Sequence, residues 1–372
     1  MPEVAVIFGG PSPEHDVSVL TGLQAARALA GRSDRPPPSV RSLFWSKTGE
    51  WYEVDPGLEA DSFLEGVPRG AVGLQFTAAP DGGFAEQGRR GRGKPLAFDA
   101  ALVCCHGGPG EDGTLQAALD LAAVPYAGPT VAGAAIGMDK LGSGALVATA
   151  GLPALPRVLL RPVGDPPDFP GPYIVKPRFG GSSIGIEVVE DFATARARLA
   201  VNRHLRSGAV LEPYRPELTD LQVAVRTWPQ LELSAIERPI RADTSSDILD
   251  YRDKYVPGEG MAGAPRELPA DIPSELEKEI RQASERIADV TGMRGVARID
   301  FLSDGREALV NEINTIPGSL ARYLWVNPPL PFTTLLDDLL AEARARPTHA
   351  YSAEGADGTV LRAAGSIAGK LG

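Results

Sequence analysis

The chain has 372 residues, enough for two or three ordinary domains with a sizeable core. Its 37 basic and 48 acidic side chains give a formal net charge of −11, so repulsion argues against nucleic acid or an anionic membrane as a partner. No apolar run of roughly 18 residues occurs, and the adjacent Cys104 and Cys105 make neither a disulfide framework nor a zinc site. These features predict a soluble, cytoplasmic, multidomain protein.

Residues 1–127 predict an α/β domain. An apolar strand at Val4–Phe8 runs into Gly9-Gly10, and the expected elements that follow are a helix at Val19–Leu29, strands at Val40–Trp45 and Ala100–Cys105, and a helix at Thr114–Ala123. Alternating strands and helices favour a parallel sheet covered by helices, with ligands at the carboxyl ends of the strands. The glycine-rich residues 60–95 give no assignment.

Two further domains and a tail are expected. Residues 128–211 predict a helix at Ala132–Ala150 and strands at Arg157–Arg161 and Tyr173–Lys176. Residues 212–347 predict an amphipathic helix at Pro273–Thr291, followed by strands at Gly295–Leu302 and Ala308–Ile313 that Ser303-Asp304-Gly305 joins. Residues 348–372 form a Gly- and Ala-rich tail of uncertain order.

The last two strands carry a candidate metal site. Because strand residues alternate between faces, Arg298 and Asp300 share one face, and Glu312 and Asn314 share one face of the return strand. Pairing the strands can bring all four side chains to one surface. Two carboxylates and an amide oxygen suit Mg²⁺, and the arginine suits a phosphate bound to the same metal. The alternative is an ordinary hairpin with one solvated face.

A glycine-rich loop is the second candidate. Lys176 ends a strand, and after Phe179 come Gly180-Gly181-Ser182-Ser183-Ile184-Gly185 and a new strand at Ile186–Val189. Such a loop can fold over phosphates with its backbone N–H groups while the lysine supplies a charge. It is not a Walker A loop, because the Gly-Lys-Ser/Thr ending is missing and a strand follows. The alternative is a simple hairpin turn.

A third segment, Gly108–Gly113, matches G-x-G-x-x-G between a strand and a helix, but we reject NAD binding. Glu111 and Asp112 would place two negative charges where a pyrophosphate should bind, and no acidic strand end follows about 20 positions later. The acidic pair is expected to cap the helix and order neighbouring loops. His15 and His106 lie beside candidate ligand loops and are expected to be structural hydrogen-bonding residues.

Seven segments, taken in order, resemble the D-alanine–D-alanine ligase family of the ATP-grasp superfamily. They read FGGPSPEHDVS, HGGPGEDGTLQ, MDKLGSG, YIVKPRFGGSSIG, DYRDKY, ARIDF and NEINTIPGS, and the resemblance covers about residues 4 to 325. It implies a three-domain ATP-grasp architecture that is α/β in the N-terminal domain and α+β in the ATP-binding part. It also implies that ATP lies between the second and third domains, in an enzyme of peptidoglycan synthesis.

The resemblance implies roles for particular residues. Lys140 and Lys176 would contact ATP phosphates, and the other nucleotide-binding residues would be Gly181, Ser182, Ser183, Glu212, Tyr214, Asp220 and Lys254. Asp300, Glu312 and Asn314 would hold two Mg²⁺ ions. Glu14 would bind the ammonium of the first amino acid with help from Ser182 and Tyr255, and Lys254 and Tyr255 would lie on a loop that closes the site. Arg298 and the Gly318 N–H would stabilise the oxyanion.

The implied reaction fits this inventory. The carboxylate of one amino acid attacks the γ-phosphate to give an acyl phosphate, and the amine of the second then displaces phosphate. Phosphoryl transfer needs mainly positioning and charge neutralisation, and the acyl phosphate must be shielded from water. No protein nucleophile is required. The expected partners are small amino-acid substrates, with a homodimer left open.

Three departures from the family pattern concern specificity. Gly180 stands where the family usually has an acidic residue, and Leu249 where it has an aromatic one. Residues 317–324 read Pro-Gly-Ser-Leu-Ala-Arg-Tyr-Leu instead of Pro-Gly-Met-Thr-Ser-His-Ser-Leu, so Tyr323 replaces a serine that helps to hold the second substrate's carboxylate. We expect Tyr323 to reshape the second-substrate pocket and Arg322 to offer a substitute carboxylate contact. Alternatively, Tyr323 packs into the core and backbone amides bind D-alanine.

D-Alanyl-D-alanine formation is therefore the leading activity. The first alternative is a dipeptide or amide ligase of specialised metabolism with a different second substrate. A non-catalytic nucleotide-binding regulator is the third option, and the two-metal ligand set argues against it, because a regulator needs no such set.

Overall fold

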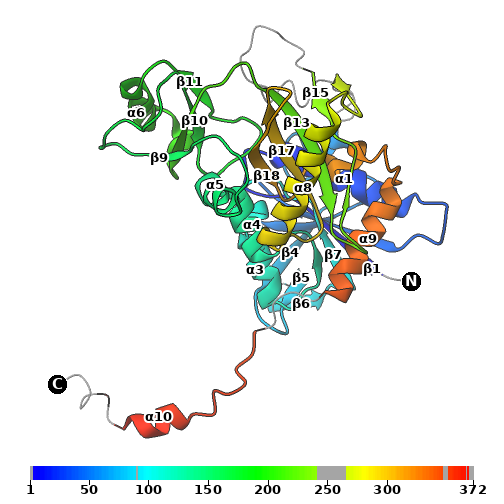
Figure 1. Ribbon diagram of the computed structural model, residues 1–372. Coiled ribbons are helices and arrows are strands. Elements are labelled where there is room, and N and C mark those ends of the chain that lie inside the picture. Colours follow the sequence, from blue (N-terminus) through cyan, green and yellow to red (C-terminus); the bar gives the residue numbers. More distant parts are fainter. Residues whose placement is uncertain (1–2, 89–90, 241–264, 347–350, 366, 368–372) are drawn as a thin grey trace.

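A computed structural model describes residues 3–88, 91–240, 265–346, 351–365 and 367. Across those residues, no helix combines the length and the apolar character needed to cross a membrane. The described residues form three hydrophobic cores. Figure 1 shows β9, β10, β11 and α6 set apart from the rest of the molecule as a small outlying subdomain.

The N-terminal domain is built on an eight-stranded sheet with the strand order β6-β5-β4-β3-β2-β1-β7-β8. Its parallel part is formed by β1 (Glu3–Gly9), β2 (Ser39–Trp45), β7 (Ala100–Val103) and β8 (Tyr126–Ala127). Its antiparallel part adds β3 (Trp51–Val54), β4 (Val72–Thr77), β5 (Gly83–Gly88) and β6 (Gly91–Pro95). The sheet is thus mixed, and the expectation of a parallel sheet holds for only one part. A five-residue connection between β2 and β3 is too short for a crossover helix and forces an antiparallel hairpin.

Helices cover this sheet and lead into the loops at its carboxyl edge. They are α1 (His15–Ala30), the short 3₁₀ helix η1 (Ala60–Phe63), the short α2 (Gly108–Glu111) and α3 (Thr114–Leu121). The apolar face of α1 is buried against β1 and β2, so the loop at Glu14 that precedes the helix is fixed at the edge of the sheet.

The single helix expected at 132–150 is two helices, α4 (Val131–Met138) and α5 (Lys140–Thr149). Asp139 between them has an extended backbone, with ψ of 100°, and its carboxylate accepts a hydrogen bond from the N–H of Leu141 at 3.0 Å. This side chain therefore caps the second helix, as aspartate does at helix starts. The break turns Lys140 inward, where it is buried.

The outlying subdomain is a four-stranded antiparallel sheet in the order β11-β10-β12-β9. Its elements are β9 (Val158–Leu160), β10 (Tyr173–Pro177), β11 (Glu187–Val189), α6 (Phe192–Val201), η2 (Arg203–Leu205) and β12 (Ala209–Pro213). A small core of its own holds this sheet together. By contrast, α5 packs its Val147 into the core of the third sheet, although it lies within the expected 128–211 domain.

The third sheet has the order β14-β13-β17-β18 and is covered by α8 (Ser274–Thr291). Its strands are β13 (Thr219–Arg226), β14 (Glu232–Leu233), β17 (Val296–Ser303) and β18 (Ala308–Asn314). A two-stranded ribbon of β15 (Arg238–Pro239) and β16 (Arg266–Glu267) adjoins it. The predicted hairpin is confirmed, with Arg298 opposite Asn314 and Asp300 opposite Glu312.

After β18 the chain returns to the N-terminal domain. A 3₁₀ segment, η4 (Gly318–Leu324), and α9 (Phe332–Ala345) bury their leucines in the first core, against α1, β7 and β8. Residues 318–345 therefore complete the first core, although η4 also contacts β13 and β17 of the third sheet, and Asp338 and Glu342 of α9 bind Arg226 and Thr227. The short α10 (Thr359–Ala364) lies on an exposed tail that Figure 1 shows extending away from the body.

Candidate active site

A central cavity lies where the three cores meet. Its walls include side chains from the loop before α1, the start of α5, the glycine loop and the β17–β18 hairpin, among them Glu14, Lys140, Ser182, Arg298, Glu312 and Asn314. The backbone of Gly318 also lines it. Most of the residues that the sequence nominated for substrate and metal are thus brought together.

A second cavity adjoins the first on the side of the outlying subdomain. It is lined by Lys176, Ser183, Glu212, Tyr214 and Asp220, and it also contains Asp300. Glu312 belongs to both cavities, so the two spaces share a wall at the hairpin. Of the nominated nucleotide-binding residues that the structure describes, these five line the second cavity, whereas Lys140, Gly181 and Ser182 line the central one.

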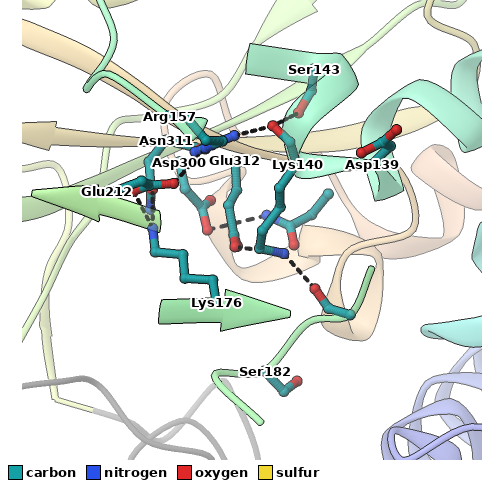
Figure 2. A network of polar contacts seen from close by, with 12 residues as sticks. Asp139, Lys140, Ser143, Arg157, Lys176, Ser182, Glu212, Asp300, Asn311 and Glu312 are labelled. Carbon is teal, nitrogen blue, oxygen red and sulfur yellow. Dashed lines mark hydrogen bonds and ion pairs between the residues drawn. The ribbon is translucent and has the colours of Figure 1, made fainter. Parts of the chain in front are cut away.

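Lys140 bridges the glycine loop and the hairpin. Its Nζ donates to the carbonyl oxygen of Gly180 at 2.5 Å and lies 3.1 Å from Oε1 of Glu312 (Figure 2). Next to it, two nitrogens of the Arg178 guanidinium donate to the two carboxylate oxygens of Asp139. These hydrogen bonds lower the pKa of Asp139, and they outweigh burial, which would raise it. The start of α5 is therefore tied to the glycine loop by two cationic side chains.

Lys176 belongs to a buried polar network. Its Nζ donates to Oε2 of Glu212 at 2.8 Å and to Oδ1 of Asn311 at 3.1 Å, and Arg157 donates to the other oxygen of Glu212 (Figure 2). Burial alone would raise the pKa of Glu212, but the charges of Lys176 and Arg157 outweigh burial and lower it. The carboxylate is ionised at neutral pH and fixes the lysine at the cavity wall.

Arg157 and Asn311 were not nominated from the sequence. Arg157 looks like the first residue of an ordinary strand, but its guanidinium also donates to the carbonyl oxygen of Asn311 at 3.0 Å. Asn311 is missed because the β17–β18 register shifts at a β-bulge between Asp300 and Phe301, which leaves Asn311 outside the paired positions. Strict alternation of faces cannot anticipate such a bulge.

The predicted metal ligands lie together on the hairpin. Arg298 donates to both carboxylate oxygens of Asp300, at 2.6 and 2.7 Å, and Nδ2 of Asn314 lies 3.1 Å from Oδ2 of Asp300. No cluster of three or more His, Cys, Asp or Glu side chains suited to a metal is found in the described part of the chain. Two carboxylates and one amide oxygen remain a fitting set for Mg²⁺, which completes its shell with water and phosphate oxygens.

Glu14 and the glycine loop meet across the central cavity. The Ser182 hydroxyl donates a short hydrogen bond to Oε1 of Glu14, and Ser182 has a φ of +52°. A Cβ atom on Gly181 would lie 2.9 Å from the same carboxylate, so a side chain there would push Glu14 out of this position. Ser182 and Gly181 thus hold Glu14 at the edge of the cavity.

The two residues expected in a second-substrate pocket, Arg322 and Tyr323, lie outside the central cavity. The Tyr323 hydroxyl accepts from Nη1 of Arg298 at 3.4 Å, the Arg266 guanidinium lies 4.5 Å from the Tyr323 ring centre, and burial raises the pKa of Tyr323 to about 12. The Arg322 guanidinium lies 5.5 Å from the ring centre of Phe332, and neither Arg322 nor Tyr323 lines the central cavity. The contact of Arg322 with the second substrate stays a prediction.

The acidic pair Glu111 and Asp112 lies at the start of α3 and contacts the loops around it. Asp112 accepts from the N–H of Thr114 at the start of α3, as expected of a capping residue, and Glu111 holds neighbouring loops. Lys254, Tyr255 and Leu249 lie outside the described residues.

Two family models match this chain. The model described as D-ala D-ala ligase N-terminus matches residues 3–129, and the model described as D-ala D-ala ligase C-terminus matches residues 168–341. The chain belongs to the D-alanine–D-alanine ligase family. The resemblance found in the seven motifs is thereby confirmed, as is the ATP-grasp fold.

Individual relatives agree with this assignment. The chain is 32% identical to the D-alanine–D-alanine ligase of Bradyrhizobium sp. (strain ORS 278), over 92% of this chain and 95% of that protein. It is also 32% identical to the D-alanine–D-alanine ligase of Sodalis glossinidius (strain morsitans), with the same shares covered. The crystal structure of the VanG D-Ala:D-Ser ligase from Enterococcus faecalis is 25% identical, with a TM-score of 0.72 over 92% of this chain and 99% of that one.

Proposed function

We propose that this member of the family is an ATP- and Mg²⁺-dependent ligase that joins two D-alanine molecules through an acyl phosphate. One observation carries the proposal: the central cavity, which Glu14 and Arg298 both line, shares Glu312 with the cavity that contains Lys176. An amino acid in the first space would thus lie next to a nucleotide in the second.

In this proposal the first D-alanine is oriented by its two charged ends. Its ammonium pairs with Glu14, which Ser182 holds in place, and its carboxylate points toward Arg298 and the Gly318 N–H. Reactants fixed in this way meet the positioning requirement of the reaction. A carboxylate oxygen then attacks the γ-phosphorus and ADP leaves.

The nucleotide phosphates would be bound by Lys140, Lys176 and the backbone N–H groups of the glycine loop, with the base near Tyr214. Asp300, Glu312 and Asn314 would hold Mg²⁺, which neutralises phosphate charge when bound. Arg298 is held by Asp300 with its guanidinium at the wall of the central cavity. It can therefore stabilise negative charge on the acyl oxygen without rearranging.

The second step consumes the acyl phosphate. The neutral amine of the second substrate attacks the acyl carbon, the tetrahedral oxyanion collapses, phosphate leaves, and the amine nitrogen loses a proton to give the amide. Arg298 and the Gly318 N–H are the groups placed to bind that oxyanion.

The packing of Tyr323 supports D-alanine as the second substrate. Because the Tyr323 hydroxyl contacts Arg298 from behind the cavity wall, the ring does not enlarge the central cavity. Backbone groups are then left to bind a small amino acid. A second candidate is a ligase with another amine-side substrate, and the similar structure named D-Ala:D-Ser ligase favours testing D-serine first.

A substrate-pair screen tests the proposal. Mg²⁺-ATP is supplied with D-alanine and a second partner (D-alanine, D-serine, D-lactate or larger amines), and products are identified by mass spectrometry. We expect D-alanyl-D-alanine with one ADP and one phosphate per product, and the same ranking of partners in Tyr323→Ser. A preference for another partner that Tyr323→Ser reverses would assign Tyr323 to the pocket, and no product from any pair would favour a regulator.

A further inference from the structure

A left-handed turn follows the metal-binding hairpin. Ser319, Leu320 and Ala321 have φ values of +51°, +51° and +52°, and none of them is glycine. L-residues avoid this region because the side chain crowds the backbone, so consecutive left-handed residues persist only where their surroundings hold them. The turn begins at Gly318, whose backbone lines the central cavity. The contacts that hold the turn therefore also set the position of the Gly318 N–H group.

The first holding group is Glu111, from the rejected G-x-G-x-x-G segment. Its Oε1 accepts from the N–H of Ile316 at 2.9 Å and from the Thr315 hydroxyl at 3.3 Å, while Oε2 accepts from the N–H of Gly107 at 2.9 Å. Glu111 itself is buried. One carboxylate therefore joins the loop after β7 to the loop after β18, about 200 residues further along the chain.

The second holding group is a relay through Thr21 and His106. The N–H of Ser319 donates to the Thr21 hydroxyl at 3.1 Å, and that hydroxyl lies 2.8 Å from Nε2 of His106. Burial lowers the pKa of His106 to about 4, although a hydrogen bond to the backbone of Ile316 opposes this. The ring is thus neutral at pH 7. We assign its proton to Nδ1, facing Ile316, so that Nε2 accepts from Thr21.

We propose that Glu111, His106 and Thr21 form an interdomain clasp that positions the Gly318 N–H at the cavity. The clasp, defined by these three side chains, grips the turn at Ile316 and Ser319, on both sides of Gly318. All three come from the N-terminal domain, whereas the hairpin that leads into the turn belongs to the third sheet. Glu111 and His106 also line the central cavity, but in this proposal all three act through the turn and are positioning residues. The consequence for catalysis rests on the proposed role of Gly318 in the ligase reaction.

The decisive variant is Glu111→Gln. Glutamine has nearly the same shape, but its amide group can accept on one side only, so either Gly107 or the pair Thr315 and Ile316 loses its acceptor. The comparison is made at pH 8, where Glu111 is ionised although burial raises its pKa to about 7. There we expect hydrogen exchange of the amides in residues 315–321 to accelerate at least tenfold. We also expect kcat for dipeptide formation to fall by about tenfold or more, as when an oxyanion donor is misplaced, with the KM for ATP unchanged.

Asp112→Asn is the matched control, because it removes the neighbouring charge but keeps an oxygen that can accept from Thr114. It should leave exchange and kcat as in the wild type. In case Glu111→Gln does not fold, Thr21→Val and Thr21→Ser provide an independent pair: valine removes the hydroxyl that links Ser319 to His106, and serine restores it. Thr21→Val should accelerate exchange at Ser319 and lower kcat, and Thr21→Ser should recover both.

The clasp is overturned if exchange in 315–321 stays at the wild-type rate in Glu111→Gln and Thr21→Val. Faster exchange with unchanged kcat would overturn its positioning role. If the wild type forms no product from any substrate pair, the ligase proposal fails, and the exchange rates still decide whether the clasp exists.

Discussion

Lys176 is buried, and two acceptors at 2.8 and 3.1 Å hold its ammonium at the wall of the second cavity. An ammonium has three donors, so a third can reach a phosphate. Lys176→Met should abolish most of the rise in melting temperature that Mg²⁺-ATP produces, because a ligand at 100 times its Kd stabilises the native state by about 2.7 kcal/mol. Lys278→Met, on the exposed face of α8, should keep the full rise. An undiminished rise in Lys176→Met would place the nucleotide elsewhere.

Glu312 is the residue that the two cavities share, and its carboxylate lies 3.1 Å from Lys140. Glu312→Gln preserves size but removes the charge that a divalent cation needs. We expect a folded protein whose kcat at saturating ATP falls by about 10²-fold or more and recovers only partly as Mg²⁺ is raised. Circular dichroism and a Mg²⁺ titration of phosphate release measure these effects. If Glu312→Gln turns over as fast as the wild type at low millimolar Mg²⁺, Glu312 is not a metal ligand.

His106 makes stability depend on pH. Burial lowers its pKa to about 4 in the folded protein, whereas the unfolded chain binds the proton near pH 6.5. The unfolded state therefore holds more protons between these values, and the free energy of unfolding falls as pH drops from 6.5 to 4, by up to about 3 kcal/mol. Glu111 acts in the opposite direction, because burial and the nearby Glu14 raise its pKa to about 7.

Urea unfolding of the wild type and His106→Gln at pH 7 and pH 4.5 isolates the histidine, because Glu111 is present in both proteins. The wild type should lose more stability than the variant on acidification. Equal losses would mean that His106 has the same pKa in the folded and the unfolded protein.

At the scale of elements, the break between α4 and α5 combines folding with function. Asp139 caps α5 and also pairs with Arg178 next to the glycine loop, whereas Asp191 only caps α6, where it accepts from the N–H of Thr194 at 2.8 Å. Both Asp139→Ala and Asp191→Ala should lower the free energy of unfolding by about 1 kcal/mol. Only Asp139→Ala should raise the KM for ATP, because it also releases the glycine loop. An equal KM for ATP in the two variants would mean that Asp139 only caps α5.

Sequence patterns predicted elements well where one rule operates at a time. Alternation along β17 and β18 placed Asp300 and Glu312 on one face, and the register confirms it. Asn311 was not predicted because a bulge breaks that alternation. The helix break at Asp139 was not predicted because apolar periodicity continues through it. The left-handed turn at 319–321 has no local signal at all, since tertiary contacts from Glu111 and Thr21 impose it. The seven motifs therefore located the site, while the supporting residues needed the structure.

At the scale of the molecule, packing interleaves distant parts of the chain. The first core contains β1 from the start of the chain and α9 from near its end, so the N-terminal domain cannot complete its core without residues 318–345. The second core likewise takes in Val147 of α5. Only the outlying subdomain of β9–β12 has a core drawn from one continuous segment, and that core is small.

The outlying subdomain should consequently be the least protected part of the fold, since a small core supplies little stability. Its contacts with the other domains include the bonds of Gly180 to Lys140, Arg178 to Asp139 and Ser182 to Glu14, all of them polar.

In the free protein, amides of β10 and β12 should exchange hydrogen faster than those of β1. Mg²⁺-ATP should slow exchange in β10 and β12 by about 10-fold or more, because Lys176 and Glu212 lie on these strands, and leave β1 unchanged. Lys176→Met should lose this protection. Mass spectrometry of deuterium uptake measures all three regions together, and protection of β1 equal to that of β10 would mean that the molecule opens as one unit and not through this subdomain.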